Sequence, residues 1–448
     1  AGIRRVLRVH TGLVRRRSMK YAGWGMSPSR TATDHNCLQI YILMSTSPLP
    51  TVVLRAGEAD RVVAGHPWIY QGSILRKPAS IPDGDLVAVK DHRDRFLGTG
   101  LYNSRSKIQI RMISPDRIEL DAAYFEQQFR HALALRQRYL PEATSFRLVN
   151  AESDSLSGLI VDRYEDVFVI QTSSLGMDQR KPAIFGALRS LASPRALVER
   201  NDAAFRKFEG MENVNGVAWG TVEKLLPVRL NGLVFEADLL SGHKTGLYLD
   251  QQVNYRLVAD LISRRPNPRV LDAFSFQGGF ALHAARAGAS AVLGIDQSAE
   301  ATALAARLAE RNGLADRCHF ETGNVFDWLK ARTTVPHGEK LIPQFDAIVL
   351  DPPSFTRTRA SVPDALRGYK EIQLRALKLL RPEGLLATFC CSHHVDAGTF
   401  LDVILSAAFD ARRVLRLVGT FTQSPDHPVL PSVPETEYLK GYALEVVR

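Results

Sequence analysis

Residues 270–280 combine an acid and two adjacent glycines in an order that suits a bound cofactor. Asp272 ends a short apolar stretch, and Gly278 and Gly279 precede a helix-forming segment. Glycines let backbone approach a ligand closely, and a helix N-terminus offers free N–H groups to an anion. Asp272 can accept from an ammonium or hydroxyl group. We therefore predict that this loop binds a cofactor through Asp272, Phe274, Ser275, Gly278 and Gly279.

Two more polar residues follow the next two predicted strands. Asp296 can accept from both hydroxyls of a ribose, and Asn324 can meet the exocyclic amine of adenine. The loop lacks the glycine spacing of a dinucleotide site and the lysine of a triphosphate site. A single acid at the end of a strand is usually a helix N-cap. Polar residues at the ends of three successive strands instead favour a bound nucleoside. The cofactor that fits is S-adenosylmethionine, which carries no phosphate.

Asp351 ends an apolar strand and is followed by Pro352 and Pro353. The prolines fix φ and stiffen the chain as it leaves the strand. Asp351, next to the cofactor, would then be held ready to accept from the N–H groups of a planar base, with both prolines beside it. The alternative is a simple strand stop, which the neighbouring cofactor pattern disfavours.

Cys390 and Cys391 end another predicted strand. Cysteine is commonly a small core residue, but here the strands that carry Asp272, Asp351 and the cysteines can lie side by side. A thiolate matters for methylating C5 of a pyrimidine, because its addition to C6 makes C5 nucleophilic. Successive strand residues point to opposite faces, so only one cysteine should face the site, and periodicity does not decide which.

The elements that must position these residues alternate between strands and helices over 250–448. We predict strands at 269–275, 291–296, 319–323, 345–351, 385–392, 415–420 and 439–446, with helices at 279–287, 298–312, 325–331, 369–380 and 396–408. This is an α/β fold with a doubly wound, Rossmann-like and mostly parallel sheet, which binds ligands at its C-terminal strand ends.

Three other regions precede this one. Residues 1–50 are Arg- and Ser-rich without periodicity, which is typical of a transit peptide, of translated sequence upstream of a start at Met44, or of an expression artefact; we expect a disordered or non-native extension. Short alternating segments over 51–118 predict a small β-barrel, and 119–240 predict a helix followed by a small α+β domain. The catalytic domain is then 241–448.

The predicted barrel is basic and carries aromatic residues. Arg55, His66 and Trp68 represent this pattern, which suits RNA contact or, equally, a solvated interaction face. The middle region holds a polar cluster, which we interpret as hydrogen-bonded turn and interface structure. Its members are Asn150, Glu152, Ser153, Asp154, Asp162 and Arg163.

Composition limits the possible functions. The net charge of +10 over 448 residues comes mostly from residues 1–50, which hold eight Lys or Arg and one acid, so it says little about nucleic-acid binding by the remainder. The four cysteines show no metal-ligand spacing, and no apolar run is long enough to span a membrane. We predict no metal, a reducing compartment and a cytoplasmic location.

Taken together, the motifs resemble the bacterial PUA-domain 23S ribosomal RNA (cytosine-C5) methyltransferases over about residues 50–448. The motifs that carry the resemblance are His66-Pro67-Trp68, Asn150-Ala151-Glu152-Ser153-Asp154, Val161-Asp162-Arg163-Tyr164, His243 to Gln251, Phe274 to Phe280, Asp351-Pro352-Pro353, Arg367-Gly368-Tyr369-Lys370, Thr388 to Ser392, Asp426-His427-Pro428 and Tyr438 to Tyr442.

The resemblance implies a PUA-like barrel, a central α+β domain and a class I methyltransferase domain that uses S-adenosylmethionine. It selects Cys391 as the nucleophile, because this cysteine precedes the serine as in the family, and it implies that Gln251 helps to close over the cofactor. Lys244 would meet RNA phosphate or the flipped base, or pin the domain junction; both remain open.

The chain departs from the family pattern at four positions. Gln277 replaces a usual threonine, Gln252 an arginine and Asn324 an aspartate, and His393 stands where glycine is frequent. Asn324 keeps a carbonyl oxygen for adenine, and a protonated His393 would lower the pKa of the neighbouring thiol.

The sequence therefore predicts an enzyme that makes 5-methylcytosine in 23S rRNA or a large-subunit precursor particle, with Cys391 and Asp351 catalytic and a homodimer possible. Two alternatives stay open. One is methylation of another RNA position without a covalent step, and the other is a non-catalytic RNA-binding ribosome assembly factor.

Overall fold

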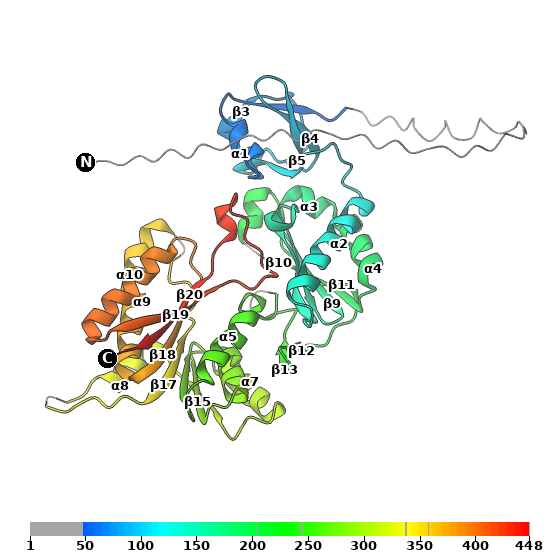
Figure 1. Ribbon diagram of the computed structural model, residues 1–448. Helices are drawn as coiled ribbons and strands as arrows, with labels where there is room; N and C mark the ends of the chain where they lie inside the picture. The colour runs from blue at the N-terminus through cyan, green and yellow to red at the C-terminus, as the bar shows by residue number, and fades with distance from the viewer. Residues whose placement is uncertain (1–47, 203, 243–244, 337, 357, 448) are drawn as a thin grey trace, which may run out of the picture. The chain divides into compact units, whose positions relative to one another are not determined.

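The computed structural model describes residues 48–202, 204–242, 245–336, 338–356 and 358–447. The predictions for residues 1–47 and for Lys244 fall outside these ranges. Figure 1 shows the helices and strands coloured along the chain. Three stretches of the described chain form sheets of six, five and seven strands, and a two-stranded hairpin lies between the second and the third. The third, seven-stranded sheet carries the residues with the chemistry described above.

The first sheet has six strands in the order β2-β6-β5-β4-β1-β3. Its strands are β1 (Thr51–Leu54), β2 (Trp68–Tyr70), β3 (Ile74–Arg76), β4 (Leu86–Lys90), β5 (Phe96–Tyr102) and β6 (Ile108–Ser114), with helix α1 (Ala59–Val63) after β1. Four of the strands match the predicted alternating segments. The other two were not predicted because three residues are too short for alternation to be seen.

The second sheet follows helix α2 (Ala122–Tyr139), which the Asp121 side chain caps by accepting from the backbone N–H of Tyr124. It has five strands in the order β11-β10-β9-β8-β7. They are β7 (Ser145–Asn150), β8 (Leu159–Tyr164), β9 (Val167–Thr172), β10 (Ala196–Asn201) and β11 (Val214–Gly220), with α3 (Leu175–Gln179) and α4 (Lys181–Ala192) between β9 and β10. The domain boundaries at 118 and 240 stay predictions.

A short hairpin leads from this part to the third sheet. Strands β12 (Leu226–Leu230) and β13 (Leu233–Ala237) pair through a two-residue turn in which Asn231 and Gly232 have φ of 51° and 84°. Positive φ at both turn residues gives the hairpin type whose twist matches the strands. The apolar side chains of the hairpin join the same core as helix α6 (Gly279–Arg286), which packs against the third sheet.

The third sheet has seven strands in the order β16-β15-β14-β17-β18-β20-β19. The strands are β14 (Arg269–Ala273), β15 (Ala291–Asp296), β16 (Cys318–Thr322), β17 (Phe345–Leu350), β18 (Leu380–Cys390), β19 (Leu415–Thr422) and β20 (Lys440–Val446). The first five pair in parallel, while β20 is antiparallel to both neighbours. The predicted doubly wound, Rossmann-like sheet is confirmed, and its strand order reverses between β14 and β17.

Helices cover both faces of this sheet. They are α5 (Gln252–Ile262), α6 (Gly279–Arg286), α7 (Ala299–Arg311), α8 (Val325–Thr333), α9 (Val362–Leu379) and α10 (Ala397–Ala411). Helices α5, α6 and α7 share one core with residues such as Val270 and Phe389, whereas α8, α9 and α10 share the other with Leu271 and Cys390. Adjacent residues of one strand therefore enter different cores.

Two helices differ from the prediction. The sequence analysis did not predict α5, although it presents a buried face to the sheet. Helix α9 begins seven residues before the predicted start at Tyr369, with a proline in its first turn. Proline is compatible with that position because the first turn has no intrahelical partner for its N–H.

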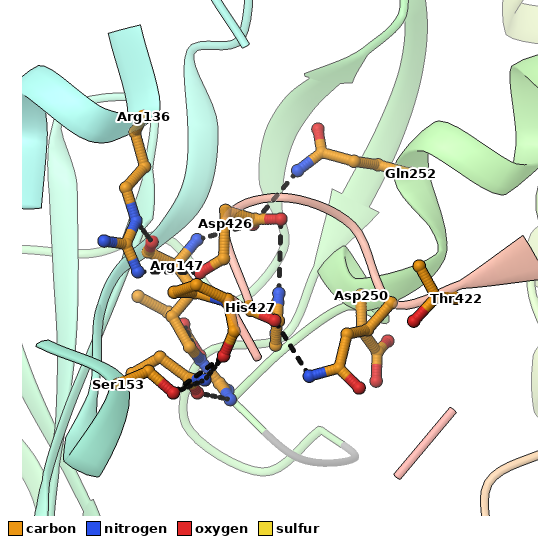
Figure 2. Close-up of polar contacts among 12 residues, drawn as sticks. Arg136, Arg147, Ser153, Asp250, Gln252, Thr422, Asp426 and His427 are labelled. Atoms are coloured by element: carbon orange, nitrogen blue, oxygen red, sulfur yellow. Dashed lines mark hydrogen bonds and ion pairs between the residues drawn. The ribbon is translucent and has the colours of Figure 1, made fainter. Parts of the chain in front are cut away.

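A buried polar network joins the loop between β19 and β20 to the second sheet. The Asp426 Oδ2 atom accepts from the backbone N–H of Arg147 at 2.9 Å and from Gln252 Nε2 at 3.1 Å. The Arg136 guanidinium donates to the Asp426 backbone oxygen at 2.8 Å, and His427 Nδ1 lies 3.2 Å from Asp426 Oδ1. Figure 2 shows Asp426 between these partners. Paired in this way, the carboxylate keeps its pKa below the usual value despite complete burial.

The polar cluster predicted at the interface takes part in such contacts. Asp154 pairs with Arg136, Asp162 with Arg147, and Ser153 Oγ donates to the Pro428 carbonyl at 2.7 Å. The hydrogen-bonded part of the interpretation is thus confirmed for these side chains, and the interface part for Ser153, whose acceptor lies in the loop between β19 and β20.

We expect Asp426→Ala to destabilise the protein by about 3 kcal/mol, because it leaves the buried donors of Arg147 and Gln252 without their acceptor. Urea unfolding followed by tryptophan fluorescence measures this loss. Asp316→Ala, at an exposed site, is the matched control and should unfold at the wild-type urea concentration. An Asp426→Ala midpoint equal to wild type would contradict a stabilising role for the network.

Candidate active site

The carboxyl ends of the parallel strands meet around one cavity of about 580 Å³. Asp296 ends β15, Asp351 follows β17, and Cys391 follows β18. The predicted site residues that line the cavity are Gln251, Phe274, Ser275, Gly279, Asp296, Asn324, Asp351, Pro352, Pro353 and Cys391. Asp272 and Gly278 belong to the same loop but are not in the cavity wall.

The glycine loop is held in a conformation that few sequences adopt. Gly278 has φ of 79° and begins helix α6. A Cβ on Gly279 would come within 2.6 Å of the Tyr255 ring, so only glycine fits there. Phe274 and Phe276 also have positive φ, at 67° and 48°. Non-glycine residues in this region cost roughly 1 kcal/mol or more each, and such strain gathers at ligand sites.

Backbone hydrogen bonds offset this strain. The N–H groups of Phe274 and Ser275 both donate to the Ile295 oxygen at 2.9 Å, and the N–H of Phe276 donates to Asp296 Oδ2 at 3.0 Å. The loop is therefore fixed against β15 before any ligand binds.

Three buried polar atoms of this loop lack a hydrogen-bond partner among the described residues. They are Asp272 Oδ1, Ser275 Oγ and Gln277 Oε1. Unpartnered buried polar atoms are rare in folded proteins and indicate a missing ligand. Acceptors of this kind suit the ammonium group of S-adenosylmethionine.

The Asp272 carboxyl is strongly perturbed by its surroundings. Its Oδ2 accepts from the N–H of Ala281 at 2.9 Å, and its side chain is almost fully buried. Burial raises the pKa of Asp272 from 3.8 to about 8, and the nearby Asp351 and Asp296 add to the shift.

Asp296, which is predicted to contact the ribose, lines the cavity. Each of its oxygens accepts one backbone N–H, from Ser298 to Oδ1 at 2.9 Å and from Phe276 to Oδ2 at 3.0 Å. A carboxylate oxygen can accept a second hydrogen bond, so both retain capacity for ribose hydroxyls.

Asn324 differs from the expectation in one respect. Its Oδ1 accepts from the N–H groups of Phe326 and Asp327, at 2.9 and 3.3 Å, and so caps helix α8. The oxygen predicted to meet adenine is thus already engaged. The group that Asn324 can offer to adenine is its amide nitrogen, which is a donor.

Gln251 contacts Asp351 across the cavity. Its Nε2 donates to Asp351 Oδ2 at 3.0 Å, and its Oε1 accepts from Asn254 Nδ2 at 2.7 Å. The 3₁₀ helix η4 (Leu249–Gln251) therefore fixes the plane of the Asp351 carboxylate, in addition to the predicted role of Gln251 beside the cofactor.

The structure separates the two cysteines. Cys390 is fully buried in the α9 core, with its Sγ 3.4 Å from the Tyr369 hydroxyl. Cys391 is half-buried and lines the cavity, with its Sγ 3.9 Å from the Pro352 carbonyl oxygen. Of the two thiols, only that of Cys391 lines the cavity.

His393 does not supply the positive charge considered for the thiol. Partial desolvation and the nearby Lys440 lower the pKa of His393, so its imidazole is neutral near pH 7. Its ring packs against Tyr438 at 5.6 Å between centroids.

The residues predicted to contact RNA from the first sheet lie outside the cavity wall. Arg55 is exposed, and its Nε donates to the Gly72 oxygen at 3.1 Å. His66 is buried, with Nε2 3.2 Å from Glu435 Oε2, and Trp68 Nε1 donates to Glu152 at 3.0 Å. The polar groups of His66 and Trp68 thus hold the protein's own parts together.

The sequence analysis did not predict several aromatic residues that line the cavity. They are Tyr248, Phe276, Phe326, Phe355 and Tyr438. Tyr248 lies three residues before Gln251 in the quoted motif His243 to Gln251, so its place near the cavity could have been predicted. Phe276 and Tyr438 also lie in motifs already quoted, whereas the places of Phe326 in helix α8 and of Phe355 in the loop after β17 depend on the fold.

Within the described residues, no group of three or more His, Cys, Asp or Glu side chains could hold a metal ion. None of the described helices is both long enough and apolar enough to cross a membrane.

The seven-stranded sheet and the cavity at its carboxyl edge are typical of enzymes that bind a nucleoside cofactor at this edge. Family models match residues 52–115 as a PUA-like domain and residues 201–440 as an S-adenosylmethionine-dependent methyltransferase. The chain belongs to this methyltransferase family, and S-adenosylmethionine is its cofactor. The predicted PUA-like and Rossmann-like fold class is thereby confirmed.

Relatives cover most of the chain. It is 37% identical over 414 residues to ribosomal RNA large subunit methyltransferase I of Klebsiella pneumoniae strain 342, covering 90% of this chain and all of the relative. The same enzyme of Escherichia coli O139:H28 is 36% identical over 403 residues, covering 88% and 99%. A Streptococcus mutans structure described as a SAM-dependent methyltransferase superposes with a TM-score of 0.73 at 22% identity, covering 88% of this chain and all of that one, which supports the fold.

We expect Asp296→Asn to weaken binding of S-adenosylhomocysteine by about 10- to 100-fold, because an amide cannot accept at both positions and loses charge-assisted bonds worth roughly 1.5–3 kcal/mol. Isothermal titration calorimetry measures the affinity. Asp316→Asn, exposed and outside the cavity wall, serves as the control. Wild-type affinity in Asp296→Asn would exclude the ribose contact.

The raised pKa of Asp272 predicts that the protein releases a proton when the cofactor binds. The pKa of Asp272 is higher in the folded protein than in the unfolded chain. The free energy of unfolding of the cofactor-free protein therefore falls as the pH rises from about 4 to about 8. An incoming ammonium favours the carboxylate, so S-adenosylhomocysteine should release about half to one proton at pH 7. Calorimetry in buffers of different ionisation enthalpy measures this number, which should fall to near zero in Asp272→Asn. Equal release in both proteins would refute the assignment.

Proposed function

We propose that the protein transfers the methyl group of S-adenosylmethionine to C5 of a cytosine in 23S rRNA through a covalent bond between Cys391 and C6. The observation that carries this proposal is the placement of the Cys391 thiol, the Asp351 carboxylate and the cofactor loop around one cavity. Methylation of an exocyclic amine would not need a thiol at this position.

Two findings favour RNA of the large ribosomal subunit as the substrate. The curated relatives that align over about nine-tenths of the chain carry this activity in their names, and residues 52–115 match a PUA-like domain. Arg55, which is exposed, and Lys244, which lies outside the described residues, are RNA contacts that we propose from the sequence. The substrate is 23S rRNA or its precursor particle in the cytoplasm, acted on by a monomer or a homodimer.

The cofactor supplies an electrophilic methyl group on a sulfonium. The Cys391 thiolate adds to C6 of the flipped cytosine, while Asp351 holds the N3/N4 edge and assists protonation at N3. C5 then attacks the methyl group. Loss of the C5 proton to a base and elimination of Sγ from C6 restore the aromatic ring and the free enzyme.

Gln251 and Tyr248 support these steps. The hydrogen bond from Gln251 keeps one Asp351 oxygen in place, so the carboxylate presents a fixed edge to the base. Desolvation and the neighbouring Asp351 raise the pKa of Tyr248 to about 12. The phenol therefore stays protonated near pH 7 and acts as a donor rather than as the C5 proton acceptor.

The two adjacent cysteines provide a matched pair of variants. We expect Cys391→Ala to reduce methyl transfer to large-subunit rRNA by at least about 10³-fold, because C5 without the C6 adduct is a poor nucleophile. Cys390→Ala, which truncates a buried core residue, should keep the activity and lower only the stability. Mass-spectrometric mapping of the rRNA product measures both outcomes.

RNA that carries 5-fluorocytosine at the target gives a second test, because fluorine cannot leave as a proton does and the adduct accumulates. Gel shift under denaturing conditions should detect this adduct with wild type and Cys390→Ala but not with Cys391→Ala. Full methylation by Cys391→Ala would favour a methyltransferase without covalent catalysis. Cofactor binding with no methyl transfer by wild type would favour an RNA-binding assembly factor.

A further inference from the structure

Three hydrogen bonds lead from the backbone of β19 to the Asp351 carboxylate. Asn254 lies in the first turn of α5 and is 2% exposed. Its Nδ2 donates to the Thr422 backbone oxygen at 2.9 Å and to Gln251 Oε1 at 2.7 Å. Gln251 Nε2 in turn donates to Asp351 Oδ2 at 3.0 Å. Asn254 is therefore connected to Asp351 through a single amide group.

The backbone end fixes the direction of these hydrogen bonds. Thr422 is the last residue of β19 and pairs with Lys440 of β20, so the sheet holds its carbonyl group. A backbone oxygen can only accept, so it must face the amide nitrogen of Asn254. The second N–H of that nitrogen needs an acceptor, which is Gln251 Oε1. The amide nitrogen of Gln251 is then left to face Asp351.

The Gln251 amide has two orientations of nearly the same shape, so packing alone does not choose between them. Within the described part of the chain, this side chain caps none of the backbone N–H groups of α5. In the reversed orientation, Oε1 would face a carboxylate oxygen of Asp351, and Nε2 would face an N–H of Asn254. Two buried hydrogen bonds would be lost, so Asn254 strongly favours the observed orientation.

We propose that Asn254 is a positioning residue that sets the orientation of the Gln251 amide and thereby makes Asp351 select the amino group of cytosine over the carbonyl oxygen of uracil. A donor binds a carboxylate more strongly than a neutral carboxylic acid, so the amide nitrogen favours ionised Asp351. A carboxylate accepts from N4 of cytosine and repels O4 of uracil. This inference deepens the proposed function, since it rests on Asp351 as the residue that binds the base.

A specificity measurement tests the inference. Two transcripts of large-subunit rRNA carry cytosine or uracil at the nucleotide that the wild-type enzyme modifies, and mass spectrometry gives kcat/KM for each. Asn254→Leu keeps the branching at Cγ but removes the donors. We expect the cytosine-over-uracil ratio to fall about tenfold. The ratio compares two substrates on one protein, so a lower folded fraction does not change it.

A ratio that stays at the wild-type value, or uracil product that stays undetectable with Asn254→Leu, would overturn the proposal. Asn312→Leu is the matched control, because it also removes an amide that donates to two backbone carbonyls, those of Val234 and Leu308, but outside the cavity wall. It should keep the wild-type ratio even if its urea unfolding midpoint falls.

A double-mutant cycle on the cytosine transcript separates positioning from a merely structural role. Gln251→Met removes the amide through which Asn254 acts. The double variant Gln251→Met with Asn254→Leu should therefore match Gln251→Met within about twofold in kcat/KM. A further loss in the double variant equal to that of Asn254→Leu alone would refute the positioning role.

These outcomes are distinct from those of the proposed function. Full methylation by Cys391→Ala would remove the covalent mechanism and leave the role of Asn254 standing. An unchanged ratio in Asn254→Leu would remove only the role of Asn254. A wild-type enzyme that methylates neither transcript would remove both.

Discussion

The order of the parallel strands is the constraint on which the rest of this protein depends. Strand β14 lies between β15 and β17, and β17 pairs with β18. Neighbouring strands are about 4.8 Å apart, so their carboxyl ends form a row of closely spaced chain exits. The cofactor loop, Asp351 and Cys391 leave from consecutive places in this row. A nucleoside cofactor and a planar base can therefore occupy adjacent halves of one cavity.

Acidic side chains that lie close together repel one another, and this repulsion favours binding of a positively charged ligand. Burial and the neighbouring carboxylates of Asp351 and Asp296 raise the pKa of Asp272, and burial and the neighbouring carboxylates of Asp351 and Asp250 raise the pKa of Tyr248. A cofactor that carries an ammonium and a sulfonium offsets the negative charge of these carboxylates. The same negative environment opposes a thiolate at Cys391.

Residues 250–252, at the end of the 3₁₀ helix η4 and the start of α5, connect this cavity to the remainder of the chain. These three consecutive polar residues have three different partners: Asp250 accepts from the Tyr438 hydroxyl, Gln251 donates to Asp351, and Gln252 donates to Asp426. Asp426 in turn accepts from the backbone N–H of Arg147 in the second sheet. Hydrogen bonds of adjacent residues therefore link the cavity to the second sheet.

The sequence by itself determined the alternating strands and helices of the third sheet, because apolar strands ending in a polar residue have a strong local signal. It also pointed to the loop over residues 270–280, of which Phe274, Ser275 and Gly279 line the cavity, because adjacent glycines before a helix have a recognisable pattern. Tertiary structure decided which cysteine faces the cavity. Both faces of a doubly wound sheet are buried, so adjacent Cys390 and Cys391 have no difference in polarity to reveal their faces. It also decided the placement of α5 against the sheet and the contact of Gln251 with Asp351, because each depends on which distant segments the strand order brings together.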